Sequence, residues 1–238
     1  MAGPRTPLLR PHRYFRRHDG SPPLAHAVAV VAVVTVAVAG GIAVFLGEFA
    51  AALDMTTTVD NPAYPGDAFC ENSAFEDTPT GCSEPKTVER EVGALVTEEL
   101  SWVPAAALVA VPLFWLFEAG VLHAASALAG GDGPFRDTLA ISGWAMAPAL
   151  VRLAAVGGFL VYQLRTVALS GSVDGAIDAL QAAIAGVQTV SLAAALVVGV
   201  WGGIIRAYGI SEARDHPVRE AALVVAVLTV LGLLYELV

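Results

Sequence analysis

Three ionisable side chains lie deep inside long apolar stretches of the sequence, where they could carry out chemistry. They are Glu118, His123 and Arg152. Ionisable side chains within a membrane span are costly and usually face the bundle interior or a cavity. With a rise of about 1.5 Å per residue, Glu118 and Arg152 would differ in depth by only about 6 Å in an antiparallel hairpin. We therefore predict an intramembrane ion pair between them. The alternative is that Arg152 snorkels and Glu118 bonds to the backbone or to water.

His123 does not share a helix face with Glu118, because five residues turn a helix by about 140°. A zinc-protease helix would need two histidines four apart with a glutamate between them, and the sequence has no such pattern. We expect His123 to be a satisfied interfacial residue. The sequence also lacks a Gly-x-Ser-x-Gly elbow, a P-loop and a dinucleotide fingerprint. We therefore expect no catalytic residue, no metal site, no cofactor and no enzymatic activity.

The two cysteines of the chain, Cys70 and Cys82, lie in a polar stretch, residues 47–101, that contains no histidine. A metal site would need more ligands at shorter spacing. A disulfide is favoured if the stretch faces an oxidising exterior, and the alternative is two unpaired thiols. In the chain-entropy model, closing a loop of this length stabilises the folded loop by about 3 kcal/mol.

The composition indicates a polytopic membrane protein. Hydrophobic residues make up 56% of the 238 residues and charged residues only 15%, where a soluble domain carries about 25% charged residues. Acidic residues outnumber basic ones, 22 to 13, which argues against nucleic acid as a partner. We interpret the excess of acidic residues as adaptation to a salty environment. The alternative is that these residues form acidic ligand sites.

Five apolar stretches are long enough to be transmembrane helices, so we predict an all-α membrane bundle. A span needs about 20 apolar residues. The stretches are residues 24–46, 102–128, 138–164, 188–205 and 221–238. The first follows a basic segment, residues 1–23, but is longer than the core of about 7–15 residues in a cleaved signal peptide.

Two further segments are expected to be helical. Within the acidic loop, residues 47–101, apolar residues recur at helical spacing over 86–100, which predicts a short helix leading into the second span. Residues 170–187 are less apolar but carry one apolar helical face. They predict either an interfacial helix or an extension that projects from the fourth span.

The basic residues predict the orientation, because Lys and Arg concentrate on the cytoplasmic side. With the N-terminus inside, nine arginines are cytoplasmic and three basic residues are outside. The inner set is Arg5, Arg10, Arg13, Arg16, Arg17, Arg136, Arg206, Arg214 and Arg219, and the outer set is Lys86, Arg90 and Arg165. We predict a multi-pass cell-membrane protein with its N-terminus cytoplasmic and its C-terminus and acidic loop outside.

A glycine-rich break separates the second and third apolar stretches. Residues 130–148 read GGDGPFRDTLAISGWAMAP. The glycines predict a tight turn that needs positive φ, and phosphate binding at the start of the third span is the alternative. The predicted turn residues are Gly130, Gly131, Gly133, Pro134 and Phe135, and the predicted kink or packing residues are Pro112, Trp144 and Pro148.

This break resembles that of the Yip-domain family of five-span integral membrane proteins, which has a Gly-Gly-x-Gly-x-Phe motif followed by a span with a proline. Residues 201–222, WGGIIRAYGISEARDHPVREAA, are similar to the family's Trp-x-x-x-x-x-x-Gly-Ile/Leu connector into its last span. The resemblance covers a four-helix region, residues 102–238. It leaves the acidic loop as an insertion between the first two spans.

The resemblance implies a non-enzymatic protein that organises membranes or acts as an adaptor through membrane-protein partners. Eukaryotic members are associated with vesicle traffic and Rab-type GTPases through long cytosolic N-terminal regions. Here only residues 1–23 precede the first span, so the chain looks like a prokaryote-like member and GTPase binding is not expected. The alternative is a small permease or channel subunit in which Glu118 and Arg152 line a route. A membrane hydrolase ranks below both, because the sequence offers no nucleophile–base set.

Overall fold

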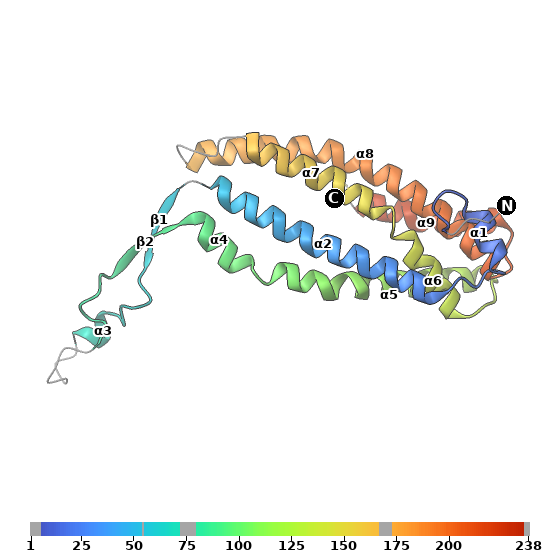
Figure 1. Ribbon diagram of the computed structural model, residues 1–238, viewed down its shortest axis with the longest axis horizontal. Helices are drawn as coiled ribbons and strands as arrows, with labels where there is room; N and C mark the ends of the chain where they lie inside the picture. Colours follow the sequence, from blue (N-terminus) through green and yellow to red (C-terminus); the bar gives the residue numbers. More distant parts are fainter. Residues whose placement is uncertain (1–5, 54, 72–79, 167–172, 236–238) are drawn as a thin grey trace.

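The computed structural model describes residues 6–53, 55–71, 80–166 and 173–235, and for residues 173–180, 182–185 and 231–235 it describes the backbone alone. These residues form a bundle of long helices with one protruding two-stranded sheet (Figure 1). The elements are α1 (Pro11–Arg17), α2 (Leu24–Ala52), β1 (Thr56–Asp60), α3 (Asp67–Cys70), β2 (Thr87–Glu91), α4 (Val92–Leu100), α5 (Val103–Leu128), α6 (Phe135–Ala145), α7 (Ala149–Thr166), α8 (Val173–Ala213) and α9 (Val218–Tyr235).

Four helical stretches are long and apolar enough to cross a membrane. They are Leu24–Ala52, Val92–Leu128, Phe135–Thr166 and Gly186–Ala213, and they contain the first four predicted spans. The fifth predicted span, residues 221–238, falls partly outside the described residues. Its described part is helical as α9, and its crossing of the membrane stays a prediction.

The helix α6 lies between three other helices, α2, α5 and α8, near the same end of the bundle as α1 (Figure 1). Apart from Leu139, every residue from Asp137 to Ala145 is buried. Small residues allow this close packing: a Cβ added at Gly143 would lie 3.0 Å from the Cβ of Ala27. The stretch that follows the glycine-rich break is therefore the core of the molecule.

The third predicted span is interrupted. Residues 146–148 form a turn between α6 and α7, closed by the Ala149 N–H donating to the Met146 carbonyl at 2.9 Å. Pro148, which is fully buried, has no N–H to continue the helical ladder. The turn sends α7 along α2 and α8, away from α5. Pro112 has no such effect, because α5 continues through it.

Two sequence predictions about helices are corrected or resolved here. The predicted helix over 86–100 is wrong for Thr87–Glu91, which is strand β2, and α4 begins only at Val92. The β-branched residues of β1 pair with β2 along their whole length, and this cross-strand pairing outweighs the local helical spacing. Residues 173–187 extend the fourth span as part of α8, a continuous helix of 41 residues, and residues 170–172 lie outside the described residues.

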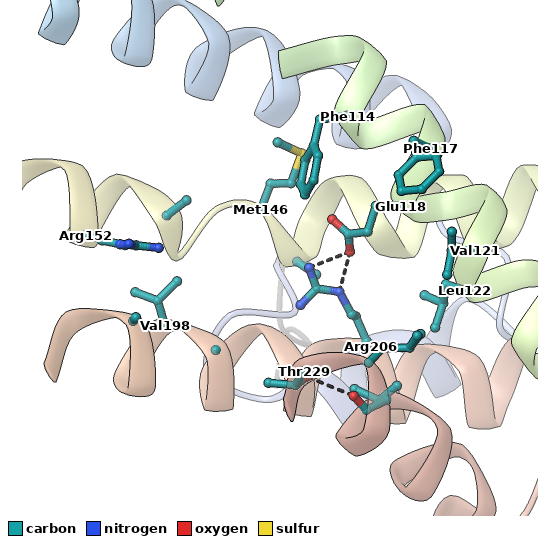
Figure 2. A pocket seen from close by; sticks show the side chains of 16 residues that line it. Phe114, Phe117, Glu118, Val121, Leu122, Met146, Arg152, Val198, Arg206 and Thr229 are labelled. Atoms are coloured by element: carbon teal, nitrogen blue, oxygen red, sulfur yellow. Dashed lines mark hydrogen bonds and ion pairs between the residues drawn. The ribbon is translucent and has the colours of Figure 1, made fainter. Parts of the chain in front are cut away.

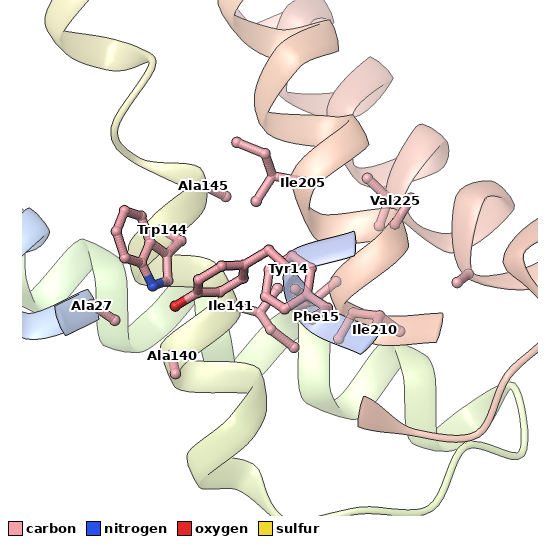
Figure 3. Close-up of a cluster of buried hydrophobic side chains, with 13 residues drawn as sticks. Tyr14, Phe15, Ala27, Ala140, Ile141, Trp144, Ala145, Ile205, Ile210 and Val225 are labelled. Carbon is pink, nitrogen blue, oxygen red and sulfur yellow. The ribbon is translucent and has the colours of Figure 1, made fainter. Parts of the chain in front are cut away.

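The described part of the N-terminal basic segment, residues 6–23, packs against the bundle. Tyr14 and Phe15 of α1 are only 1% and 0% exposed, and they lie among side chains of α6 and α8 (Figure 3). Trp201 Nε1 donates to the Leu8 carbonyl at 2.7 Å. Gly20, with φ +73°, lets the chain pass the end of α8, because a Cβ there would lie 2.3 Å from the Glu212 carbonyl oxygen. Its described arginines, Arg10, Arg13, Arg16 and Arg17, are therefore held at one end of the bundle.

Candidate functional site

An ion pair joins α5 and α8 inside the bundle. Glu118 Oε1 accepts a hydrogen bond from Arg206 Nε at 2.6 Å and lies 2.5 Å from Arg206 Nη2. The two side chains are 19% and 21% exposed. Each charge thus has a close partner of opposite sign, which is what makes an ionisable group tolerable in such an environment.

The predicted Glu118–Arg152 pair is corrected, because the arginine bound to Glu118 is Arg206. Arg152 instead donates from Nη2 to Ser191 Oγ on α8 at 3.2 Å. The depth argument assumes two straight antiparallel helices. The turn at residues 146–148 breaks that geometry, because it places α7 and its arginine beside α8.

Sequence reasoning misses Arg206 by ending the fourth span at residue 205. The structure continues α8 to Ala213, which places Arg206 within the helix. The sequence contains a signal that the helix continues, because apolar residues lie on both sides of the arginine. Two of them, Ile205 and Ile210, are fully buried. Gly202 leaves room for the guanidinium of Arg206, because a Cβ at residue 202 would lie 2.7 Å from Arg206 Nη1.

A cavity of about 640 Å³ adjoins the ion pair (Figure 2). Its walls come from α5, α7, α8, α9 and the end of α6, and most of the lining is apolar. Glu118, Arg152 and Arg206 all line it, so the two residues singled out from the sequence share one cavity without pairing. Within this mostly apolar space, Arg152 lies apart from the Glu118–Arg206 pair (Figure 2).

A second polar cluster holds the glycine-rich break to the connector between α8 and α9. Arg214 is only 3% exposed. It donates to the carbonyls of Gly131 at 2.7 Å and Gly133 at 3.0 Å, and its Nη1 lies 2.8 Å from His123 Nδ1. Because arginine only donates, Nδ1 must be the acceptor, so the proton of the neutral ring is on Nε2. We call this cluster, with His216, the clasp.

The glycines of the break adopt the turn that the clasp requires. Gly130 and Gly133 have positive φ, 90° and 154°. Gly131 is needed for a close approach, because a Cβ there would lie 2.6 Å from His216 Nε2, which in turn donates to the Ser126 carbonyl at 3.2 Å. Pro134 precedes α6 and Phe135 begins it. The residues predicted to form the hairpin turn thus lie together at one end of the bundle.

The start of α6 offers poor conditions for the alternative of phosphate binding. Asp137 occupies its first turn and is buried, with Ser21 Oγ donating to its carboxylate at 2.7 Å. A carboxylate in this position already complements the positive end of the helix dipole. A phosphate there would meet a second negative charge.

The two cysteines form a disulfide in the protruding sheet and its loop, residues 55–71 and 80–91, which we call the arm. The Cα atoms of Cys70 and Cys82 are 5.4 Å apart. Lys86 Nζ lies 2.6 Å from Asp67 Oδ1, and this contact lowers the pKa of Asp67 and raises the pKa of Lys86. The described part of the arm is thus a two-stranded hairpin held by the disulfide and this ion pair.

Long apolar helices, a glycine-rich break followed by the buried helix α6, and a clasped connector together define a multi-pass helical membrane protein. The chain belongs to the Yip1 domain family, whose family model matches residues 6–237. The match begins before the first span, whereas the resemblance seen in the sequence begins at residue 102. No curated protein matches the chain, nor does any solved structure.

Proposed function

We propose that this chain is a non-enzymatic membrane adaptor, which organises a membrane by holding protein partners there. The observation that carries the proposal is how its ionisable groups are used. Glu118 is engaged by Arg206, and Arg214 by His123 and the turn carbonyls. These contacts join helices to one another. A reaction centre needs an acid, base or nucleophile that can reach a substrate, whereas a scaffold needs contacts of this kind between its helices.

The proposal includes an orientation. The N-terminus and the clasp lie in the cytoplasm, α9 is the fifth span, and the arm lies outside the cell membrane. With Arg206 assigned to a helix, eight of the nine arginines of the inner set remain, namely Arg5, Arg10, Arg13, Arg16, Arg17, Arg136, Arg214 and Arg219, against three basic residues outside. That excess favours the clasp end as the cytoplasmic end.

Proximity labelling in the native membrane tests the adaptor role. A labelling enzyme that is active outside the cell would be fused into the loop of the arm. A cytoplasmic labelling enzyme would be fused to the N-terminus of an otherwise identical chain. We expect a reproducible set of membrane proteins on at least one side. A folded, membrane-inserted chain that yields no reproducible partner on either side would contradict the proposal.

A second candidate is a small permease or channel subunit, and the cavity shared by Glu118, Arg152 and Arg206 favours it. Uptake of small ions and solutes by vesicles containing the purified chain is the test. Flux that is abolished by Glu118→Gln and kept by Glu99→Gln, an exposed glutamate of α4, would establish transport. Absence of flux in the unaltered protein would leave the adaptor as the better function.

A further inference from the structure

The outer edge of β1 is open to another strand. The Val92 N–H donates to the Met55 carbonyl and the Asn61 N–H to the Lys86 carbonyl, so residues 55 and 61 turn their backbone groups toward β2. Backbone groups of an antiparallel strand alternate in direction. Thr56 and Thr58 therefore turn their N–H and C=O groups away from β2. Among the described residues, no other backbone segment bonds to them there.

The two edges of this sheet differ in chemistry. Glu89, Arg90 and Glu91 put charges along β2, which is how native proteins discourage strand addition. From Thr56 to Val59, β1 has four uncharged β-branched residues, the types that favour extended structure. The arm extends beyond the helix ends (Figure 1), and β2 is the main packing neighbour of β1. The edge of β1 is therefore accessible, and from Thr56 to Val59 it carries no charged residue that would discourage strand addition.

The side chains beside this edge define what an added strand should carry. Thr56, Thr58 and Asp60 share one face of the sheet with their partners Glu91, Glu89 and Thr87. That face thus presents three carboxylates. The opposite face carries Val59 and Val88, and its Arg90 is engaged by Glu98 at 2.9 Å. Beside β1, an added strand would meet Asp60 and two threonines on one face, with Glu89 and Glu91 one strand further across the sheet, and Thr57 and Val59 on the other face.

We propose that the outer edge of β1 binds an extended segment of a partner protein in which Lys or Arg alternates with apolar residues, making a third strand of the sheet. The inference rests on the proposed adaptor role and names the kind of partner that the arm fits. Backbone hydrogen bonds to Thr56 and Thr58 supply the affinity, and the carboxylates select the basic strand. A second copy of this chain fits less well, because its own arm carries the same acidic face.

The test is peptide binding to the full chain in lipid nanodiscs. The probe is a labelled Lys-Val-Lys-Val-Lys-Val peptide, followed by fluorescence anisotropy. Thr58→Pro removes an outward N–H and leaves the β1–β2 ladder its donors. Thr87→Pro is the matched control, because it removes the outward N–H at the far edge of β2. We expect Thr58→Pro to weaken binding at least tenfold and Thr87→Pro to leave it unchanged.

Two peptide controls separate strand addition from attraction between charges. Two N-methylated versions of the peptide keep its charge. One carries backbone N-methyl groups on its Val residues and the other on its Lys residues, so each version blocks hydrogen bonding along only one edge of the peptide strand. We expect one of the two versions to lose binding, and a Glu-Val-Glu-Val-Glu-Val peptide not to bind. Equal binding of both methylated versions and the parent, or equal loss in Thr58→Pro and Thr87→Pro, would overturn the proposal.

The adaptor role and the β1 site can fail separately. Thiol labelling first establishes that Cys70 and Cys82 remain oxidised in each variant, so that a lost arm fold is not mistaken for a lost edge. If Thr58→Pro keeps all proximity-labelled partners, the adaptor role stands and β1 is not its site. Dimers that form in the unaltered chain and disappear in Thr58→Pro would identify a second copy as the occupant and overturn the choice of a basic partner.

Discussion

Arg214 binds three groups from other segments, and through them it holds the break between α5 and α6 to the connector between α8 and α9. Its guanidinium spreads its N–H groups in a plane, so it can reach the carbonyls of Gly131 and Gly133 and the ring of His123 at once. A lysine ammonium is a compact point charge and cannot reproduce this fork. The shape of the group matters here as much as its charge.

We therefore expect Arg214→Lys to destabilise the bundle by about 2–4 kcal/mol, since hydrogen bonds to charged groups contribute about 1.5–3 kcal/mol each. Thermal unfolding of the purified protein in detergent measures the loss. Arg219→Lys is the matched control, because Arg219 is exposed at the start of α9. Equal unfolding temperatures for the two variants would show that the fork geometry is unimportant.

The Glu118–Arg206 pair gives a second prediction at this scale. Glu118→Gln leaves Arg206 without its carboxylate, and breaking a buried pair costs about 3–5 kcal/mol. Because each side chain is about a fifth exposed, we expect about 2 kcal/mol, below that range. Glu118→Arg combined with Arg206→Glu should recover part of the loss in a thermal unfolding assay. Recovery by Glu118→Arg with Arg152→Glu, and not by this exchange, would instead support the pair predicted from the sequence.

Among the elements, α6 shows how closely small residues bring the helices together. Gly209 of α8 faces it, and a Cβ at that position would lie 2.8 Å from Ile141 Cγ1 and 3.2 Å from Ile141 Cβ. Ile141 is β-branched and fully buried, so its side chain has few rotamers in which to make room. The close packing between α6 and α8 therefore depends on residue 209 being glycine, which has no side chain.

Gly209→Ala should accordingly destabilise the fold by about 1–3 kcal/mol, the usual cost of overpacking. Gly120→Ala is the control and should stabilise the fold, because a Cβ at Gly120 meets nothing within 4 Å. Alanine is favoured over glycine in a helix by up to about 1 kcal/mol. Chemical denaturation in mild detergent compares the two variants, and a stabilised Gly209→Ala protein would show that Ile141 moves freely.

The sequence predicts these elements where the information is local. Long apolar stretches are enough to place the first four spans. The glycines at 130 and 133 are likewise enough to place a turn. Strand β2 cannot be found that way, because its partner β1 lies about thirty residues earlier and its own residues have helical spacing. The fourth span is predicted to end at residue 205, just before the first charge, although α8 continues through Arg206, whose charge Glu118 neutralises. Contacts made across the fold decide both cases.

Within the whole molecule, the arm is the part that the disulfide and a surface ion pair maintain. The bundle does not depend on either, because its buried clusters lie in α1, α2, α5, α6, α8 and α9. Reduction of the Cys70–Cys82 bond should therefore loosen the arm, by about 3 kcal/mol in the chain-entropy model, and leave the bundle folded. Limited proteolysis with and without reductant should cut the arm alone. Loss of helical circular dichroism on reduction would contradict this division.

The same arm gives a prediction about pH. Its Lys86–Asp67 contact lowers the pKa of Asp67 and raises that of Lys86. A lowered carboxyl pKa means that the contribution of Asp67 to arm stability is complete above its unfolded pKa and is lost as the pH falls through the folded one. A raised lysine pKa places the loss of Lys86 on the alkaline side. We expect constant protease resistance of the arm around neutral pH and a fall in acid that is absent in Asp67→Asn.

The helix α8 has 41 residues, so at 1.5 Å per residue it is about 60 Å long, twice the roughly 30 Å of a bilayer's hydrocarbon core. About half of it must therefore stand outside the lipid tails or lie steeply inclined within them. A helix is stiff over that distance, so where α8 stands outside the lipid tails, the membrane thickness sets the height at which its end is held above the headgroups. Thinner or thicker membranes would change that height, and with it the distance at which this protein can meet a neighbour.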